Sequence, residues 1–331
     1  MDDLSQLLDR ARESSYKAFG KSIHFYAPSF MRYEKPFYSS PSCAFKSISI
    51  TGNECDLGCK HCGGRVLRTM IPATTPDQLL AICTRLAKQG CGGCLISGGC
   101  LPNGMMPLEE FIPTISRVKH ELGLKIAIHT GIIRKKVAEE LVRAGVDMAL
   151  IDILGSDETI EEIYRLNVRT ADYDSSMSAL EESGIPFVPH VIVGLHYGRL
   201  LGEFNALQMI SRHNPSGLVV IALIPLRKTL MEHVEPPKPD DIAHVIAEAR
   251  LMLPRTPVAL GCMRPSGRHR VITDVLAVNA GVNAIAFPED EAVERARILG
   301  LETHFHAACC AQTYEDCFQG RFPAPSRESH R

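Results

Sequence analysis

Three cysteines in one short run are the residues of this chain best suited to chemistry. Cys55, Cys59 and Cys62 occur in the segment Cys-Asp-Leu-Gly-Cys-Lys-His-Cys, directly after an apolar stretch that is typical of a strand. Thiolates grouped at this spacing are common ligands of iron–sulfur clusters. Three thiolates bind three irons of a four-iron cluster and leave the fourth iron open. A small molecule can then chelate that iron and accept an electron from it.

Other roles for the triplet fit less well. A structural zinc site normally has four protein ligands from two short-spaced pairs, and no second pair follows at zinc-finger distance. Disulfides fit poorly with twelve cysteines in a chain whose first ten residues are acidic and polar, unlike a secretory signal. Buried thiols are the remaining alternative. The sequence therefore predicts an iron–sulfur cluster at the triplet.

The composition is that of an ordinary globular protein. The chain has 331 residues, of which 45% are hydrophobic and 22% charged, and its net charge is −2. Such a chain can bury a large core, and it has no broad basic surface for nucleic acid. No apolar stretch is long enough to span a bilayer. We expect a protein of the reducing cytoplasm, with neither nucleic acid nor membrane as a partner.

The elements that must position the triplet alternate along most of the chain. An amphipathic helix is predicted over Leu4–Lys21, followed by an irregular stretch over Ile23–Ser42. The predicted strands are Phe45–Thr51, Cys94–Ser97, Lys125–Thr130, Met148–Ile153, Phe187–Val193, Gly217–Leu223, Val258–Leu260 and Ala284–Ala286. The predicted helices between and after them are Thr75–Gln89, Leu108–Glu121, Arg134–Ala144, Asp172–Ser183, Arg199–Arg212, Lys238–Leu251, Arg268–Asn279 and Asp290–Leu299.

This alternation predicts an α/β fold with a parallel sheet. Eight strand–helix pairs indicate a complete (β/α)₈ TIM-type barrel, and a six-strand partial barrel is the alternative because the last two strands are short. The expected divisions are a helical prefix over residues 1–43, the barrel over 44–288, and a C-terminal helix with a cysteine-rich tail over 289–331. The polar end from Pro323 is expected to be disordered.

The triplet and its place after the first strand resemble those of the radical S-adenosylmethionine (radical SAM) enzymes. The resemblance implies a [4Fe–4S] cluster held by Cys55, Cys59 and Cys62, with S-adenosylmethionine on the open iron. A reducing electron donor of the ferredoxin or flavodoxin type would supply the electron. Cleavage of S-adenosylmethionine would give a 5′-deoxyadenosyl radical that abstracts hydrogen from an unactivated carbon.

The same resemblance implies residues that bind the cofactor. A Gly-Gly-Glu element after the second strand of these enzymes corresponds to Gly98, Gly99 and Cys100 here, preceded by Ser97, so the acid is replaced by a cysteine. His61 stands where the family often has an aromatic residue that packs on adenine; an exposed loop histidine is the alternative.

Three further positions follow from the strand ends. Asp152 is expected to bind ribose hydroxyls, and the alternative is a helix N-cap. Gly194 fits close packing against the adenosyl group. Arg264 is expected to contact a substrate carboxylate or a cluster, because the segments around Pro225 and Arg264 resemble those of the biotin synthase branch.

Other cysteines indicate a second, auxiliary cluster. Two fall at predicted strand ends, and three follow the last predicted helix, where the tail can fold back over the barrel. The candidate ligands are Cys100, Cys262, Cys309, Cys310 and Cys317. Exposed, unreactive thiols are the alternative. Cys83 is expected to be core packing.

An auxiliary cluster that donates sulfide, in a biotin synthase-like chain, predicts sulfur insertion into an alkyl chain. The family implied is the two-subunit lipoyl synthases, with an octanoyl-carrier protein as substrate and a homologous partner subunit. Biotin synthesis itself is disfavoured, because the third strand carries His129 where a cluster cysteine is expected. The alternatives are a radical rearrangement or cofactor-maturation enzyme, and a non-catalytic electron-transfer or redox-sensing protein.

Overall fold

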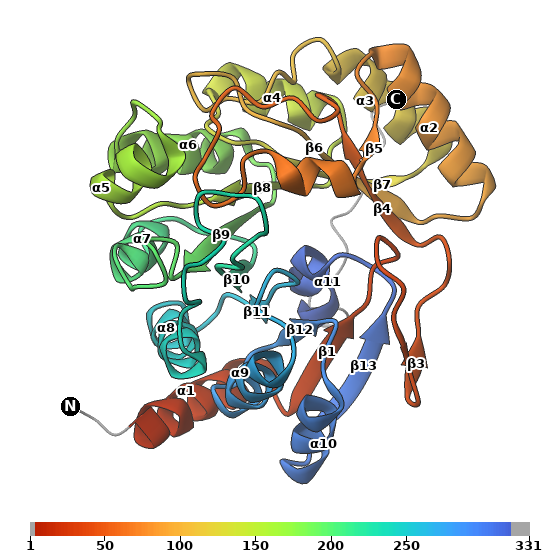
Figure 1. Ribbon diagram of the computed structural model, residues 1–331. Coiled ribbons are helices and arrows are strands. Elements are labelled where there is room, and N and C mark those ends of the chain that lie inside the picture. The colour runs from red at the N-terminus through yellow and green to blue at the C-terminus, as the bar shows by residue number, and fades with distance from the viewer. Residues whose placement is uncertain (1–3, 319–331) are drawn as a thin grey trace.

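A computed structural model describes residues 4–318 of the chain. Eleven strands form one sheet, and a separate two-stranded hairpin lies beside it. Figure 1 shows the strands curled around a central space, with the helices of the strand–helix repeats outside. The fold is therefore a barrel-like arrangement whose strands all run in the same direction.

The strands and their order are as follows. The strands of the large sheet are β1 (Ser22–Tyr26), β4 (Phe45–Ser49), β5 (Ile71–Pro72), β6 (Gly93–Ser97), β7 (Lys125–His129), β8 (Met148–Asp152), β9 (Phe187–Val193), β10 (Leu218–Ala222), β11 (Val258–Leu260), β12 (Ala284–Ala286) and β13 (Glu302–His306). Their order is β13-β1-β12-β11-β10-β9-β8-β7-β6-β4-β5, and every neighbouring pair is parallel. The hairpin consists of β2 (Glu34–Lys35) and β3 (Tyr38–Ser39).

The helices connect these strands. The α-helices are α1 (Leu4–Phe19), α2 (Pro76–Lys88), α3 (Ile112–Leu122), α4 (Lys135–Arg143), α5 (Asp157–Thr159), α6 (Thr170–Ser183), α7 (Glu203–Ile210), α8 (Pro239–Met252), α9 (Arg268–Asn279), α10 (Asp290–Ile298) and α11 (Thr313–Phe318). Shorter turns are the 3₁₀ helices η1 (Arg65–Thr69) and η3 (Cys310–Gln312) and the π-helix η2 (Ile160–Tyr164). No helix within residues 4–318 is both long and apolar enough to cross a membrane.

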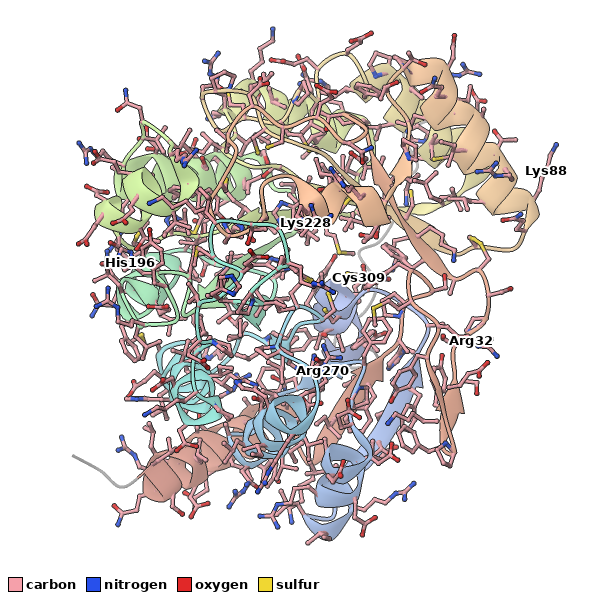
Figure 2. All side chains as sticks on the ribbon, viewed as in Figure 1. Arg32, Lys88, His196, Lys228, Arg270 and Cys309 are labelled. Atoms are coloured by element: carbon pink, nitrogen blue, oxygen red, sulfur yellow. A yellow bond between two sulfur atoms is a disulfide. The ribbon has the colours of Figure 1, made fainter. Side chains whose placement is uncertain are left out.

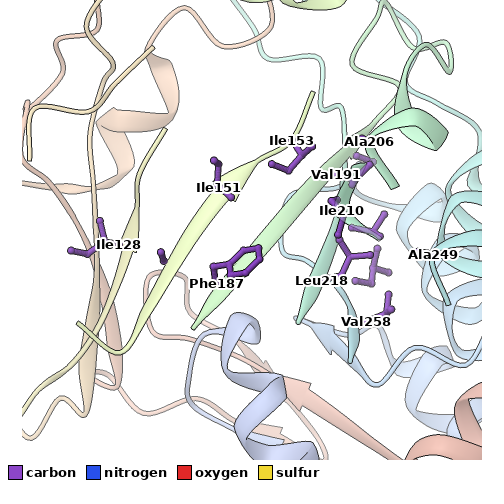
Figure 3. Packing of buried hydrophobic residues seen from close by; sticks show 14 of the residues in the cluster. Ile128, Ile151, Ile153, Phe187, Val191, Ala206, Ile210, Leu218, Ala249 and Val258 are labelled. Atoms are coloured by element: carbon purple, nitrogen blue, oxygen red, sulfur yellow. The ribbon is translucent and has the colours of Figure 1, made fainter. Parts of the chain in front are cut away.

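All eight predicted strands are confirmed, and they lie side by side in chain order from β4 to β12. Other residues of the protein cover both the inner and the outer face of these strands. For this reason the strands are continuous runs of apolar residues in the sequence. Figure 3 shows part of this packing, in which Val191 of β9 lies beside Ala206 and Ile210 of α7, while Ile151 and Phe187 belong to the same buried cluster. Burial of each such Ile or Phe side chain contributes about 1.5–3 kcal/mol.

The prediction of a complete eight-stranded barrel is not confirmed, and six strands are too few. Among the described strands, no ladder joins the β4–β5 edge to β12. Instead β1 pairs with β12, and β13 extends the same edge. Near the seam the Ser29 hydroxyl accepts hydrogen bonds from the backbone N–H groups of Ala44 and Phe45, at 2.8 and 3.2 Å. The sheet thus runs across both of the predicted boundaries, at residues 43/44 and 288/289.

The predicted N-terminal helix is confirmed as α1, and it lies on the outside of the fold. It packs against α8 and α9 (Figure 1). The Arg12 guanidinium donates to the Asn279 carbonyl oxygen at 3.0 Å. A Cβ on Gly281 would approach the Arg12 Cα to 2.7 Å, so the helix sits directly against this turn. α1 therefore supports the sheet from the outside, through its contacts with α8 and α9, and does not cover the carboxyl end of the sheet.

The segment that follows β13 turns into the centre of the fold. Cys310 and Ala311 are buried against inward-facing residues of the strands, such as Val219 and Ala284. The Tyr314 hydroxyl donates to the Asp147 carbonyl oxygen at 3.3 Å, just before β8. Figure 1 shows α11 within the ring of strands. Residues 307–318, called the inner segment below, thus fill the space that the strands enclose. The predicted disordered end from Pro323 lies outside the described residues.

One pair of cysteines lies away from this centre. Cys43 and Cys91 form a disulfide, with Cα atoms 5.0 Å apart, beside the starts of β4 and β6. The starts of parallel strands lie at the opposite end of the sheet from the carboxyl ends, where sites are built in such folds. These two cysteines therefore take no part in the site.

Candidate functional site

The cysteine triplet lies in the loop that follows β4, at the carboxyl end of the sheet. The Sγ atoms of Cys59 and Cys62 and a ring nitrogen of His61 lie within 4.8 Å of one another. Cys55 is near enough for its charge to raise the pKa of Cys59. Backbone bonds hold the turn, because the Cys62 and Gly63 N–H groups both donate to the Cys59 carbonyl, at 3.3 and 2.8 Å. Three converging soft thiolates fit an iron–sulfur cluster.

The two buried thiols differ in their readiness to ionise. A hydrogen bond from Cys59, and then the neighbouring His61, lower the pKa of Cys62 to about 4. The same hydrogen bond, together with burial, raises the pKa of Cys59. The site thus favours the thiolate form at Cys62, and thiolate is the form that binds metal.

The glycine turn after β6 supports the triplet loop directly. A Cβ on Gly99 would lie 2.0 Å from the Glu54 carbonyl oxygen and 2.6 Å from the Cys55 Cα. The Gly99 N–H donates to the Thr51 hydroxyl at 2.7 Å, and a Cβ on Gly98 would meet Thr51 at 3.2 Å. Gly99 is therefore needed for the two loops to touch, and a Cβ on Gly98 would make only tight contacts with the Ile50 and Thr51 side chains. Ser97, predicted beside them, is buried at the end of β6.

Cys100 belongs to the triplet side of the site. The Cys55 Sγ lies 3.9 Å from the Cys100 carbonyl oxygen, and the Asp56 N–H donates to the same oxygen at 3.0 Å. Burial, and then the charges of Cys55 and Asp152, raise the pKa of Cys100 to about 12. A fourth thiol thus stands beside the three predicted ligands.

His61 has the surroundings of a stacking residue. Its ring stacks on Tyr164, with centroids 5.1 Å apart and planes 29° apart. Tyr164 ends the π-helix η2, a rare element that is frequent at functional sites. The His61 Nδ1 is buried and has no hydrogen-bond partner among the described residues. A buried nitrogen left without a partner is costly.

A hydrogen-bonded group ties the triplet loop to its neighbours. The Lys60 ammonium donates to the Tyr197 hydroxyl at 2.7 Å and lies 3.3 Å from Glu162. The Tyr197 hydroxyl in turn donates to Glu162 at 2.7 Å. The triplet loop, the π-helix and the turn after β9 are thereby joined.

A second cluster of polar side chains lies at the ends of three adjacent strands. His129 of β7, Asp152 of β8 and His190 of β9 place one nitrogen or oxygen atom each within 4.8 Å of the others. The His129 Nε2 lies 3.4 Å from an Asp152 carboxylate oxygen. The predicted ribose contact of Asp152 has no support in this arrangement, because the carboxylate faces the two imidazoles. The N-cap role falls to Ser156, which accepts from the Thr159 N–H at 3.2 Å.

The predicted auxiliary cysteines separate into two groups. Cys309, at the start of the inner segment, is close enough to Cys262 that its charge raises the pKa of that thiol. Cys310 is its neighbour and is also near Cys262. Figure 2 shows Cys309 near the centre of the fold. Cys317 lies in α11, where its charge affects Tyr26 and Arg250, and Cys100 lies with the triplet.

Arg264 does not have the predicted contact with substrate. Its side chain is fully buried and forms a double salt bridge with Asp274, at 2.6 and 2.8 Å. Its remaining N–H groups donate to the carbonyl oxygens of Gly261, Ala286 and Phe287, at 2.7, 2.9 and 3.2 Å. All five donors of the guanidinium are therefore used inside the protein. Arg264 fixes the chain after β11 and β12 and is not a catalytic residue.

Gly194 is also explained by the protein itself. Its φ is +72°, and a Cβ there would lie 2.6 Å from the Pro237 ring. Its N–H donates to the Glu203 carboxylate at 2.8 Å. The glycine is thus required by the packing of Pro237, and the predicted contact with an adenosyl group is not needed to account for it.

Three residues near the site are not among those predicted from the sequence. His190 carries the clearest signal, because it is the histidine of an otherwise apolar strand segment and has the inward phase of Val188 and Ile192. Tyr164 had no local signal. Arg270 donates to the Cys262 and Arg264 carbonyl oxygens at 3.3 and 3.0 Å, and its buried Nε has no partner among the described residues.

Comparison with known proteins agrees with the prediction of an iron–sulfur site at the cysteine triplet. A model of the radical SAM superfamily matches residues 49–197. The biotin synthase of Halorhodospira halophila is 28% identical over 192 residues, which are 55% of this chain and 55% of that protein. The biotin synthase of Alkalilimnicola ehrlichii is 25% identical over 289 residues, or 80% and 83% of the two chains. For several of these curated relatives, the chain spans little more than half of their length.

Solved structures show the same fold. Methylornithine synthase (PylB) superposes with a TM-score of 0.64 at 16% identity, over 95% of this chain and 91% of that one. The [FeFe]-hydrogenase maturase HydG gives a TM-score of 0.66 at 14% identity, over 96% and 73%. At such identities the likeness concerns the fold alone. Residues 49–197 are thus similar to the radical SAM superfamily, and the spacing of the three thiols and their place after β4 agree with that similarity.

Proposed function

We propose that the protein holds a [4Fe–4S] cluster through Cys55, Cys59 and Cys62 and cleaves S-adenosylmethionine reductively. When bound, the cluster supplies the electron that breaks the C5′–S bond, and the 5′-deoxyadenosyl radical so released takes hydrogen from an unactivated carbon. The observation that carries the proposal is the grouping of Cys59 and Cys62, with Cys55 nearby in the same loop, beside the tightly packed Gly99 turn. A ferredoxin- or flavodoxin-type protein would supply the electron.

The residues around the triplet have tasks in this proposal. The Gly98–Gly99 turn brings backbone to within contact of the triplet loop, where carbonyl oxygens can receive the cofactor's ammonium group. Because Cys100 stands where the family has a glutamate, no carboxylate is present at this position to bind the ammonium group. The His61 ring, which stacks on Tyr164, would stack on adenine in this proposal. The Lys60–Tyr197–Glu162 group would hold the triplet loop in position against the π-helix and the turn after β9.

We further propose that the reaction is sulfur insertion into an alkyl chain, with an auxiliary iron–sulfur cluster as sulfur donor. Cys262, Cys309 and Cys310 support this, because they gather in the interior near the carboxyl end of the sheet. Cys317 is too far along α11 to be favoured as a ligand. A lipoyl synthase-like activity on an octanoyl-carrier protein, with a homologous partner subunit, is the specific form that we propose.

Measurements of iron content and of reaction products test both proposals, the cleavage of S-adenosylmethionine and the insertion of sulfur. Anaerobically reconstituted protein is expected to hold two four-iron clusters per chain and to release 5′-deoxyadenosine with dithionite as reductant. The variant with Cys55, Cys59 and Cys62 changed to Ala should lose one cluster and all 5′-deoxyadenosine. The variant C262S/C309S/C310S should lose the other cluster and keep cofactor cleavage.

Each other outcome favours a different function. A single cluster with active cleavage would contradict sulfur insertion and favour a radical rearrangement or a cofactor-maturation step. Clusters without cleavage of S-adenosylmethionine in fully reconstituted protein would favour electron transfer or redox sensing. Loss of cleavage in C262S/C309S/C310S, with the first cluster intact, would contradict the division of the thiols into two groups.

A prediction concerns the stacking residue. His61→Ala should raise the KM for S-adenosylmethionine by roughly 5- to 100-fold, because stacking of a base on an aromatic ring is worth about 1–3 kcal/mol. His61→Phe keeps a flat ring against Tyr164 and should retain most of the affinity. The measurement is the rate at which deoxyadenosine is released as the concentration of S-adenosylmethionine is varied. An equal rise in KM for both variants would show that the imidazole nitrogen, and not the ring, makes the contact.

A further inference from the structure

The cluster formed by His129, Asp152 and His190 has no role in the function proposed above. The three residues occupy corresponding places on neighbouring strands, at the last positions of β7 and β8 and the middle of β9. In a parallel ladder such positions face the same side, and here that side is the interior of the barrel. The sheet itself thus brings two imidazoles and one carboxylate together.

Hydrogen bonds within the described part of the protein do not occupy all the ligand atoms of these three side chains. The His129–Asp152 contact is 3.4 Å, longer than an ordinary hydrogen bond. No hydrogen bond from another part of residues 4–318 reaches the Asp152 carboxylate, although its side chain is only 27% exposed. A carboxylate withdrawn from water needs a positive charge beside it, which either a protonated His129 or a bound metal ion can supply. The carboxylate is therefore available to a positive ion.

One imidazole is already oriented for coordination. The His190 Nδ1 lies 3.1 Å from the Val188 carbonyl oxygen, so it donates its proton there. The Nε2 is then left with a lone pair, and one ring nitrogen of His190 lies within 4.8 Å of a ligand atom of His129 and of Asp152. A histidine that ligates a metal through one nitrogen usually donates the other N–H to a backbone carbonyl or carboxylate. The ring of His129 stands at 55° to it, with centroids 5.7 Å apart, so the two rings converge without stacking.

From this geometry we propose that His129, Asp152 and His190 form a binding site for a single divalent transition-metal ion, Fe²⁺ in iron-loaded protein, in the interior of the barrel. Two imidazoles and one carboxylate with open positions suit such an ion. The charge of Asp152 is felt by Cys100 on the triplet side, and that of Cys309 by His129 on the other side. The ion therefore lies between the triplet and the inner segment, where its open positions can bind a polar group of the substrate.

Cobalt tests this site without interference from the iron–sulfur clusters. Full-length protein with Cys55, Cys59, Cys62, Cys262, Cys309 and Cys310 changed to Ser, purified free of iron, is titrated anaerobically with Co²⁺. We expect one equivalent of Co²⁺ with visible ligand-field absorption and no thiolate charge-transfer band. Its proton NMR spectrum should show a paramagnetically shifted N–H signal from each imidazole, and that of His190 should exchange slowly because it donates to Val188.

Variants in this background decide the question. His190→Gln and His129→Gln should each weaken Co²⁺ binding by roughly 100-fold or more, since loss of a mere outer-shell partner already costs roughly 10–100-fold. His233→Gln, at a side chain that is 92% exposed, is the matched control and should bind as the parent does. Circular dichroism verifies that each variant is folded.

Two results would overturn the proposal. The first is the absence of stoichiometric Co²⁺ binding in folded protein of the six-serine background. The second is binding that survives in His129→Gln and His190→Gln. Because the cluster thiols are absent from the test protein, failure here leaves the proposed cofactor cleavage untouched, and failure of that cleavage leaves the metal site standing.

Discussion

Gly99→Ala is expected to remove most of the activity while the fold survives. The new Cβ would lie 2.0 Å from the Glu54 carbonyl oxygen and 2.6 Å from the Cys55 Cα, so the triplet loop must shift. These are backbone atoms, which cannot rotate away as a side chain can. A displacement of about 1 Å at a reacting centre can cost on the order of 100-fold in rate. We expect a loss of that size in the release of 5′-deoxyadenosine, together with a lower iron content.

The neighbouring glycine Gly92 provides the matched control. A Cβ there would have its nearest neighbour, the Ala44 carbonyl oxygen, at 3.8 Å, which is ordinary contact. Gly92→Ala should therefore keep iron content and cofactor cleavage near those of the parent. If Gly99→Ala also retained both, the close approach of the two loops would have no part in holding the cluster.

Asp274→Ala is expected to cause the largest loss of stability. Asp274 and Arg264 are fully buried and joined by two hydrogen bonds of 2.6 and 2.8 Å. Removal of one partner from a buried ion pair leaves the other charge uncompensated, which costs about 3–5 kcal/mol. The free energy of unfolding, measured by anaerobic urea titration followed by circular dichroism, should fall by that amount.

A double variant distinguishes loss of the pair from general damage. Asp274→Leu with Arg264→Met removes both charges, so its loss should be smaller than the sum of the two single changes. Glu121→Ala is the control, since Glu121 pairs with Arg117 at 2.9 Å on the surface and its loss should leave stability near that of the parent. Additive losses in the double variant would mean that the two charges do not depend on each other.

The sequence predicts the repeating part of the fold well and its two ends poorly. Each strand from β4 to β12 is an apolar run beside an amphipathic helix, so local pattern and tertiary burial agree. β1 and β13 carry histidines and aromatic residues at alternating positions, such as His24 and His306, and their pairing depends on strands more than 250 residues away. No local pattern reports such distant pairing, and this explains why β1 was predicted to be irregular and the barrel to be closed.

The residues of the site likewise include some that the sequence predicts well and others that it does not. The triplet and Gly99 were predicted because their constraints lie in contiguous sequence. Arg264 was misread, because its partner Asp274 lies on the following helix and sequence alone does not reveal which donors are already occupied. His190 was overlooked for the opposite reason, since its importance comes from neighbours on two other strands.

The inner segment has a consequence for how the protein is made. Every strand of the sheet leaves the ribosome before residues 307–318, yet Cys310 and Ala311 complete the packing that the strands surround. The nascent polypeptide therefore cannot complete the packing at its centre until residues 307–318 have been synthesised, after all the strands that surround them.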